Sequence, residues 1–187
     1  MGMDSYLYLT DRKSFEKEMK HIKEQEKKIA SYYSFVNEMI EKYPVLKGHF
    51  HEIENIQKAL SKEEMDEFDR LFNLCIDKED ASFGENRVEL NYWRKPYPLH
   101  KYIVKHFHKD GTDSNCVNIP LDKDGVVKMI DSMKKCSMRF SDCKKGTDDF
   151  YNDEYYGEDN LKSDIIFFKG LLDKFNDDVA IYYYAWY

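Results

Sequence analysis

The sequence predicts an α+β fold in which helices pack on a mainly antiparallel sheet, with an N-terminal helical insertion. Strand-like segments rich in β-branched and aromatic residues lie at 5–10, 87–93, 116–121 and 179–187. Helical periodicity fills the stretches between them, an arrangement that favours an antiparallel sheet. With 187 residues, of which 42% are hydrophobic, the chain is long enough for one domain with a substantial core.

We expect this single domain to consist of a helical lobe at 11–86 and a sheet core at 87–187. The first strand, at 5–10, alternates in a strand-like way and leads into a long helix over 11–43. Pro44 ends that helix, because its ring removes a backbone donor and clashes with the preceding turn.

A second helical segment covers about 50–60, and a capping box marks the start of a third helix. Ser61 is followed three residues later by Glu64, so each side chain can bind the other residue's backbone N–H. The apolar residues behind this cap recur at helical spacing: Met65, Phe68, Phe72, Cys75 and Ile76. The polar segment 77–86 predicts a loop.

The strand at 87–93 ends at an extended turn, because Pro96 and Pro98 disfavour the α region in the residues before them. A helix over 98–108 follows. Its core-facing stripe is predicted to contain Leu99, Tyr102, Ile103, His106 and Phe107. The opposite face carries Lys101, Lys105 and His108.

The remaining elements are a strand at 116–121, a helix capped by Asp122, an acidic loop at 141–160, a helix over 161–175 and a strand at 179–187. The stripe of the last helix contains Leu161, Ile165, Phe168, Leu172 and Phe175. This periodicity predicts that the last helix packs on the sheet.

The stretch 91–109 is basic and aromatic, although the whole chain has a net charge of -7. It contains no carboxylate. Five aromatic rings are interleaved with its cations: Tyr92, Trp93, Tyr97, Tyr102 and Phe107. Such a concentration of positive charge in an acidic chain predicts a site for an anionic ligand.

We predict a ligand-binding site formed by Tyr92, Trp93, Arg94, Lys95, His100, Lys101 and Lys105. Arg94 can form a bidentate pair with a phosphate or carboxylate while an aromatic ring stacks on a base. The helix N-terminus adds backbone donors that favour anions. In a purely structural alternative, Trp93 packs in the core, Arg94 pairs with the acidic loop and His100 caps or packs. A nucleic-acid groove is less favoured, because the net charge gives no long-range steering.

The acidic loop holds seven carboxylates against two lysines. Its carboxylates can be solvated, pair with the basic helix or bind a hard cation, although no EF-hand spacing is present. They can also imitate a phosphate backbone in a nuclease groove. For this last role we predict a partner-binding set: Asp148, Asp149, Asp153, Glu154, Tyr155, Tyr156, Glu158 and Asp159.

Motifs for catalysis, cofactors and metals are absent from the sequence. It contains no P-loop, no nucleophile elbow, no dinucleotide fingerprint and no zincin motif, which disfavours an enzyme. The four cysteines lack a CxxC spacing and predict reduced thiols. A zinc site from Cys136 and Cys143 plus histidines is the less favoured alternative. We therefore predict no cofactor and no metal.

We expect a cytoplasmic protein that does not enter the membrane. No signal peptide is visible at the N-terminus. No apolar run approaches the roughly 20 residues needed to span a bilayer. The sequence leaves the oligomeric state open, and a homodimer through exposed tyrosines is one alternative.

Three segments carry a resemblance to a known family: MGMDSYLYL, NYWRKPYPLHKYIV, and YNDEYYGEDNLKSDI with IYYYAW. The chain resembles a family of small bacteriophage and prophage proteins over residues 1–10 and 87–187. The resemblance implies that Tyr92, Trp93, Arg94, Lys95, His100, Tyr155 and Tyr156 are family-pattern positions. This chain differs from the family pattern at 136–146, where it has CSMRFSDCKKG in place of the family's Gly-Phe-Phe-Phe-Gly segment.

The resemblance implies a phage-type accessory protein acting in the cytoplasm of a bacterial host cell. The leading hypothesis is a binding protein that inhibits a host defence nuclease, such as a CRISPR effector, so that its partner is a host protein or nucleoprotein. The second is a module that sequesters a small anionic or nucleotide ligand. The third is an enzyme on a phosphorylated or nucleotide substrate, with His100 as acid/base and Arg94 as anion clamp.

Overall fold

The computed structural model describes residues 2–50, 52–76, 87–108 and 115–187. The chain forms an α+β structure that divides into two compact units. The sheet unit contains residues 1–15 and 84–187, and the helical unit contains residues 16–83. Residues 1–15 therefore belong with the sheet, although they precede the helical unit in sequence.

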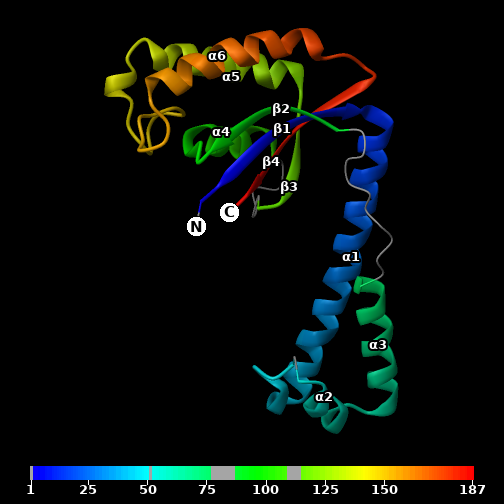
Figure 1. Cartoon of the computed structure of the whole chain (residues 1–187). Helices are drawn as coiled ribbons and strands as arrows, with labels where there is room; N and C mark the ends of the chain where they lie inside the picture. Colours follow the sequence, from blue (N-terminus) through cyan, green and yellow to red (C-terminus); the bar gives the residue numbers. More distant parts are fainter. Residues whose placement is uncertain (1, 51, 77–86, 109–114) are drawn as a thin grey trace. The chain divides into compact units, whose positions relative to one another are not determined.

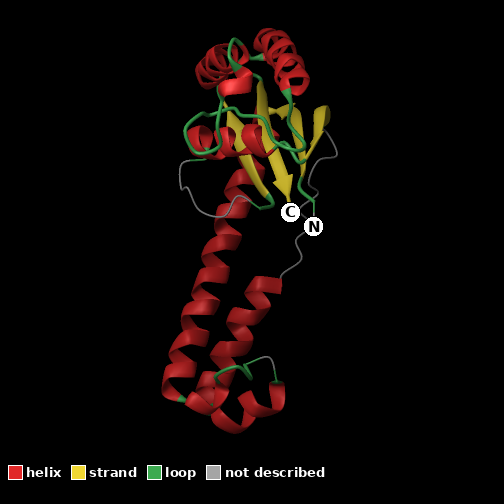
Figure 2. Cartoon of the chain, turned by 90° about the vertical axis from the view of Figure 1, so that its left-hand side faces the viewer, coloured by secondary structure: helices red, strands yellow, loops and turns green. Residues whose placement is uncertain are grey.

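The sheet unit is built on four antiparallel strands in the order β2-β1-β4-β3. The strands are β1 (Asp4–Asp11), β2 (Val88–Arg94), β3 (Val117–Leu121) and β4 (Val179–Trp186). The first and last strands occupy its centre and pair along their whole length, from Asp4 opposite Trp186 to Asp11 opposite Val179. The two termini consequently lie side by side (Figures 1 and 2).

Strand alternation gives the sheet two chemically different faces. The covered face carries mainly apolar side chains: Leu7, Trp93, Ile119, Leu121, Ile181, Tyr183 and Ala185. The other face carries Tyr6, Tyr8, Tyr92, Tyr182, Tyr184 and Trp186, and we call these six residues the aromatic face. The register between β1 and β2 shifts between Leu7 and Tyr8, which marks a local irregularity in this alternation.

Three helices pack on the covered face: α4 (Tyr97–Phe107), α5 (Lys123–Ser137) and α6 (Glu158–Leu171) (Figure 1). Short 3-10 turns follow α5 at Phe140–Asp142 and α6 at Leu172–Lys174. The helix stripes and the sheet form one core, whose fully buried members include Leu99, Val126, Met129, Leu161 and Phe168. Burial of these stripes is the main stabilising contribution in this unit.

The stripe predicted for α4 is largely confirmed. Leu99, Tyr102, Ile103 and Phe107 are buried, and Lys101 and Lys105 are exposed as expected. His106 was placed in the stripe wrongly: its side chain is exposed, with its ring 4.2 Å from that of Tyr102.

The helical unit contains most of α1 (Arg12–Lys42), the 3-10 turn Pro44–Leu46, α2 (Ile53–Ala59) and α3 (Lys62–Ile76). Its core is separate from that of the sheet and contains Met39, Leu46, Ile56, Leu60 and Phe68. The predicted capping box is present, since the Ser61 N–H donates to Glu64 and the Glu64 N–H donates to Ser61 Oγ. No helix in the described part of the chain is long and apolar enough to cross a membrane.

Both ends of the last helix differ from the prediction, and the second helix begins at Ile53 instead of about residue 50. The last helix begins at Glu158 instead of residue 161, because the Asn160 side chain accepts the Gly157 N–H at 2.9 Å and fixes the start of α6. Its regular part ends at Leu171 and not at residue 175. The predicted loop at 77–86 lies outside the described residues.

Replacement of Gly125 by Ala tests the packing of α5 against α4. A Cβ atom at Gly125 would lie 2.4 Å from Cε1 of the buried Phe107 ring, so either this ring or the two helices must shift. We expect Gly125→Ala to lower the free energy of unfolding by about 1–3 kcal/mol, measured by urea denaturation. Gly170→Ala is the control: no atom lies within 4 Å of its Cβ position, and the gain in helix propensity is expected to raise stability by up to about 1 kcal/mol. Equal effects of both substitutions would contradict this packing.

Candidate functional site

The end of β2 divides the predicted ligand-binding group between the two faces of the sheet. Trp93 pairs with Ser5 and belongs to the covered face, whereas Tyr92 and Arg94 pair with Tyr6 and Asp4 on the other. Successive side chains of a strand point to opposite faces, so these three residues cannot surround one ligand on a single face. Lys101 and Lys105 lie further away along the exposed side of α4.

Trp93 is a core residue whose indole makes a buried polar contact. Its Nε1 donates to Oδ1 of Asp164 at 2.8 Å, and its ring stacks on Phe168. The other carboxylate oxygen of Asp164 accepts the hydroxyl of Tyr156 at 2.6 Å. The three side chains thus satisfy one another in the interior, which is the condition for burying polar groups at low cost.

Burial raises the pKa of Asp164 to about 6, although the hydrogen bonds from Tyr156 and Trp93 act in the opposite direction. Sequence reasoning missed this residue. The available signal was its position three residues after Leu161 and one before Ile165, which places a carboxylate within the apolar stripe of α6.

His100 belongs to a second polar chain on the covered face. Its Nδ1 lies 3.1 Å from the hydroxyl of Tyr183, which in turn donates to Oγ of Ser5 at 2.8 Å. Burial lowers the pKa of His100 and raises that of Tyr183. These shifts favour a neutral imidazole and a neutral phenol within a structural network.

Lys95 connects the end of β2 to the acidic loop. It has a positive φ of 53°, and its N–H donates to the carbonyl of Met3 at 2.7 Å. Its ammonium lies 3.8 Å from the centre of the Tyr155 ring, a cation–π contact. Tyr97 meets the same ring edge-on.

Carboxylates of the acidic loop are engaged within the chain. Asp149 pairs with Lys105 at 3.3 Å and accepts Ser132 Oγ at 3.0 Å. Asp148 pairs with Arg139 at 2.6 Å, and Glu158 with Lys162. The predicted pairing with the basic helix is thus present for Asp149 and Lys105, whereas Asp148 and Glu158 pair with cations outside that helix.

The other residues of the predicted partner-binding set lie in different environments. Tyr156 is fully buried, and Asp153 accepts the N–H of Tyr155 at 2.9 Å. Burial therefore removes Tyr156 from a partner contact, while Glu154, Glu158 and Asp159 are exposed.

The aromatic face is the largest array of aromatic side chains on a single face of the described sheet. Ring centres are separated by 5.1 Å between Tyr92 and Tyr6, by 5.8 Å between Tyr6 and Tyr8, and by 5.5 Å between Tyr8 and Tyr182. Phe15, in the first turn of α1, stacks on Tyr182 and covers that end of the array. The opposite end is open, with Tyr92 exposed by 44% and Trp186 by 46%.

Charged side chains of both signs flank these rings. The Tyr92 hydroxyl donates to Asp4 at 2.7 Å, and the guanidinium of Arg87 lies 4.4 Å from the centre of the Tyr8 ring. Arg94 is exposed and forms no ion pair within the described residues. The exposed rings and the exposed guanidinium of Arg94 can contact a ligand without any change in the core.

Comparisons with family models, with curated proteins and with solved structures find no match to this chain. The two faces of the sheet and their side chains are therefore the basis for assigning a function.

The Asp164 carboxyl makes stability depend on pH. Its pKa is about 6 in the folded chain and ordinarily 3.8, so the folded state binds the proton more tightly. The stabilisation that this bound proton gives to the folded state is fully present below pH 3.8 and is lost as the pH rises through about 6. The free energy of unfolding thereby falls by roughly 3 kcal/mol. We expect the free energy of unfolding of the wild type, minus that of Asp164→Asn, to fall by roughly 2–3 kcal/mol between about pH 4 and about pH 7 in urea titrations. Asp159→Asn, an exposed carboxylate of the same helix, is the control. A difference that does not change with pH would rule out a raised pKa.

Proposed function

We propose that this protein acts by binding a macromolecular partner, and that the open end of the aromatic face is the contact. The observation that supports this most directly is the grouping of exposed Tyr92, Trp186 and Arg94 on one side of the sheet. Tyr, Trp and Arg are the residue types that contribute most to binding energy at protein interfaces. Their positions on paired strands limit the conformational entropy lost on binding.

A protein fits this surface better than a nucleic acid. The cations Arg87 and Arg94 alternate with Asp4 and Glu89, so the face presents charges of both signs. A polyanion would meet carboxylates there, and the chain's net charge of -7 would oppose its approach. Mixed charge around aromatic rings suits a protein partner with complementary charges.

The resemblance to phage proteins suggests what kind of partner the aromatic face binds. The segments that carry it include β1, β2 and β4, which are adjacent in the sheet and supply every ring of the aromatic face. On this basis the partner is a host protein or nucleoprotein, and a defence nuclease is the specific candidate. The protein would then act as an inhibitor by occupying a surface that the nuclease needs.

Binding is better supported than catalysis. The enzymatic alternative requires His100 as acid/base and Arg94 as anion clamp on the same substrate. His100 contacts Tyr183 on the covered face, whereas Arg94 belongs to the strand positions of the aromatic face. A shared substrate would have to bridge the sheet.

Charge reversal at Arg94 tests the contact. We expect Arg94→Glu to weaken partner binding roughly 30-fold or more, because it removes an exposed anchor of the aromatic face. Lys169→Glu on the exposed side of α6 makes the same charge change and is expected to have no effect. The measurement is quantitative affinity capture of partners from bacterial lysate, followed by titration of the captured partner.

A second pair of variants tests the rings. Tyr92→Ala is expected to reduce capture as Arg94→Glu does, whereas Ile166→Ala, which removes a side chain exposed by 72%, is expected to leave it unchanged.

Native mass spectrometry distinguishes a macromolecular partner from a small ligand. A bound mass of a few hundred daltons that disappears in Arg94→Ala would indicate a small anionic ligand. Equal capture by the Arg94 and Lys169 variants would reject the proposed surface.

A further inference from the structure

Two cysteines and a carboxylate lie close together at the end of α5. None of them belongs to the aromatic face that we propose as the partner contact. Cys136 lies in the last turn of α5, Cys143 follows the 3-10 turn Phe140–Asp142, and Asp148 lies in the acidic loop. The two sulfur atoms and a carboxylate oxygen all lie within 4.8 Å of one another. Cys136 is exposed by 5%, Cys143 by 7% and the Asp148 side chain by 12%. The turn between the cysteines explains how residues seven positions apart converge without a CxxC spacing.

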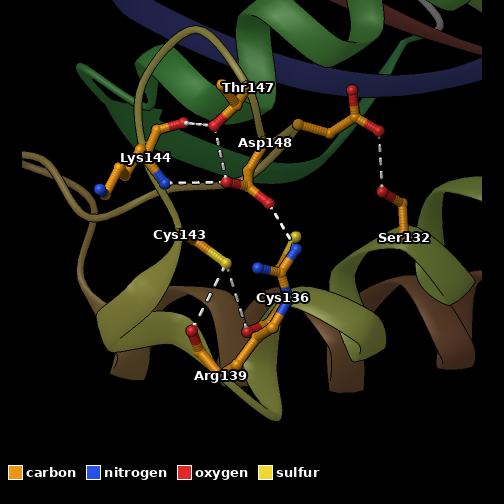
Figure 3. Close-up of polar contacts among 8 residues, drawn as sticks. Ser132, Cys136, Arg139, Cys143, Lys144, Thr147 and Asp148 are labelled. Atoms are coloured by element: carbon orange, nitrogen blue, oxygen red, sulfur yellow. Dashed lines mark hydrogen bonds and ion pairs between the residues drawn. The ribbon is translucent and has the colours of Figure 1, made fainter.

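The carboxylate of Asp148 is held in place from three directions (Figure 3). One oxygen accepts the backbone N–H of Lys144 at 2.9 Å and the hydroxyl of Thr147 at 3.0 Å. The other accepts Arg139 at 2.6 Å. Hydrogen bonds of this kind orient a ligand and are the usual support of a metal-binding side chain.

The thiol of Cys143 is oriented by the same turn. Its sulfur lies 3.7 Å from the carbonyl oxygen of Cys136 and 3.6 Å from that of Arg139, as weak hydrogen bonds (Figure 3). Burial raises its pKa to about 11, so the thiol keeps its proton at neutral pH and a metal would have to displace it.

These distances are close to those of a tetrahedral site. Zinc–sulfur and zinc–oxygen bonds of about 2.3 Å and 2.0 Å place neighbouring ligand atoms roughly 3.5–3.8 Å apart. Contraction of the cluster by at most about 1.3 Å would therefore complete the geometry, and rotation of the two cysteine side chains can supply that movement.

We propose that Cys136, Cys143 and Asp148 bind a thiophilic divalent cation, with Zn²⁺ as the probe that best fits two sulfurs and one oxygen. Two thiolates and one carboxylate carry three negative charges, which Zn²⁺ and the adjacent guanidinium of Arg139 together balance. The third ligand is the Asp148 carboxylate and not a histidine, since no histidine in the described part of the chain joins this cluster. Three protein ligands leave the fourth position to water or to an added ligand.

Zinc titration of the reduced, chelator-treated full chain tests the site. We expect one equivalent of Zn²⁺ to bind and to raise the melting temperature. Cys136→Ser and Cys143→Ser should each weaken binding more than about 100-fold, and Asp148→Asn about 10–100-fold. Cys116→Ser removes an exposed thiol outside the cluster and is the matched control, with unchanged affinity.

Cobalt provides a readout of the ligand type. Co²⁺ in the site is expected to show a thiolate-to-cobalt charge-transfer band in the near ultraviolet, which weakens in each of the two Cys→Ser variants and persists in Asp148→Asn. Circular dichroism of every variant without metal establishes that a loss of binding is not a loss of folding.

Alkylation of the unmodified chain tests the same site without any substitution. One equivalent of Zn²⁺ should slow the reaction of Cys136 and Cys143 with N-ethylmaleimide at least about tenfold and leave Cys116 unchanged, as mapped by peptide mass spectrometry. Failure to bind Zn²⁺ at micromolar concentration, equal binding by Cys143→Ser, or protection of Cys116 instead of the pair would overturn the proposal.

Discussion

The pairing of the first strand with the last is the constraint on which the sheet unit depends. β1 and β4 lie at opposite ends of the sequence and at the centre of the sheet, and β2 and β3 can join only at their outer edges. Eight consecutive residue pairs fix this register. A slip of one residue would exchange the two faces, bringing the tyrosines into the core and Leu7 into water. Both faces described above therefore follow from one ladder of backbone hydrogen bonds.

That register gives the basic and aromatic stretch two different roles. Trp93 and His100 become parts of buried polar networks, with Asp164 and Tyr183 as their partners. Tyr92 and Arg94, next to Trp93 in sequence, remain on the other face. A motif that looks like one site in the sequence thus supplies buried residues to one face and exposed residues to the other.

The acidic loop is better understood as an organised part of the sheet unit than as a free negative surface. Its carboxylates bind Lys105, Ser132 and Arg139, which belong to α4, α5 and the segment after α5. The loop thereby joins the helices on the covered face, and its residue Asp148 is held next to two buried thiols. Three of the seven carboxylates of the loop, Asp148, Asp149 and Glu158, form ion pairs within the described part of the chain.

The sequence by itself determined the fold class and nearly every helix and strand, because side-chain periodicity and caps such as Ser61–Glu64 and Asp122 are local properties. It also identified the cationic stretch and its unusual composition. Only the tertiary structure decided which side chains share a face, which carboxylates are paired and that Asp164, Cys136 and Cys143 lie in polar clusters. Those relations depend on strand register and on contacts between residues far apart in the chain, which no local pattern specifies.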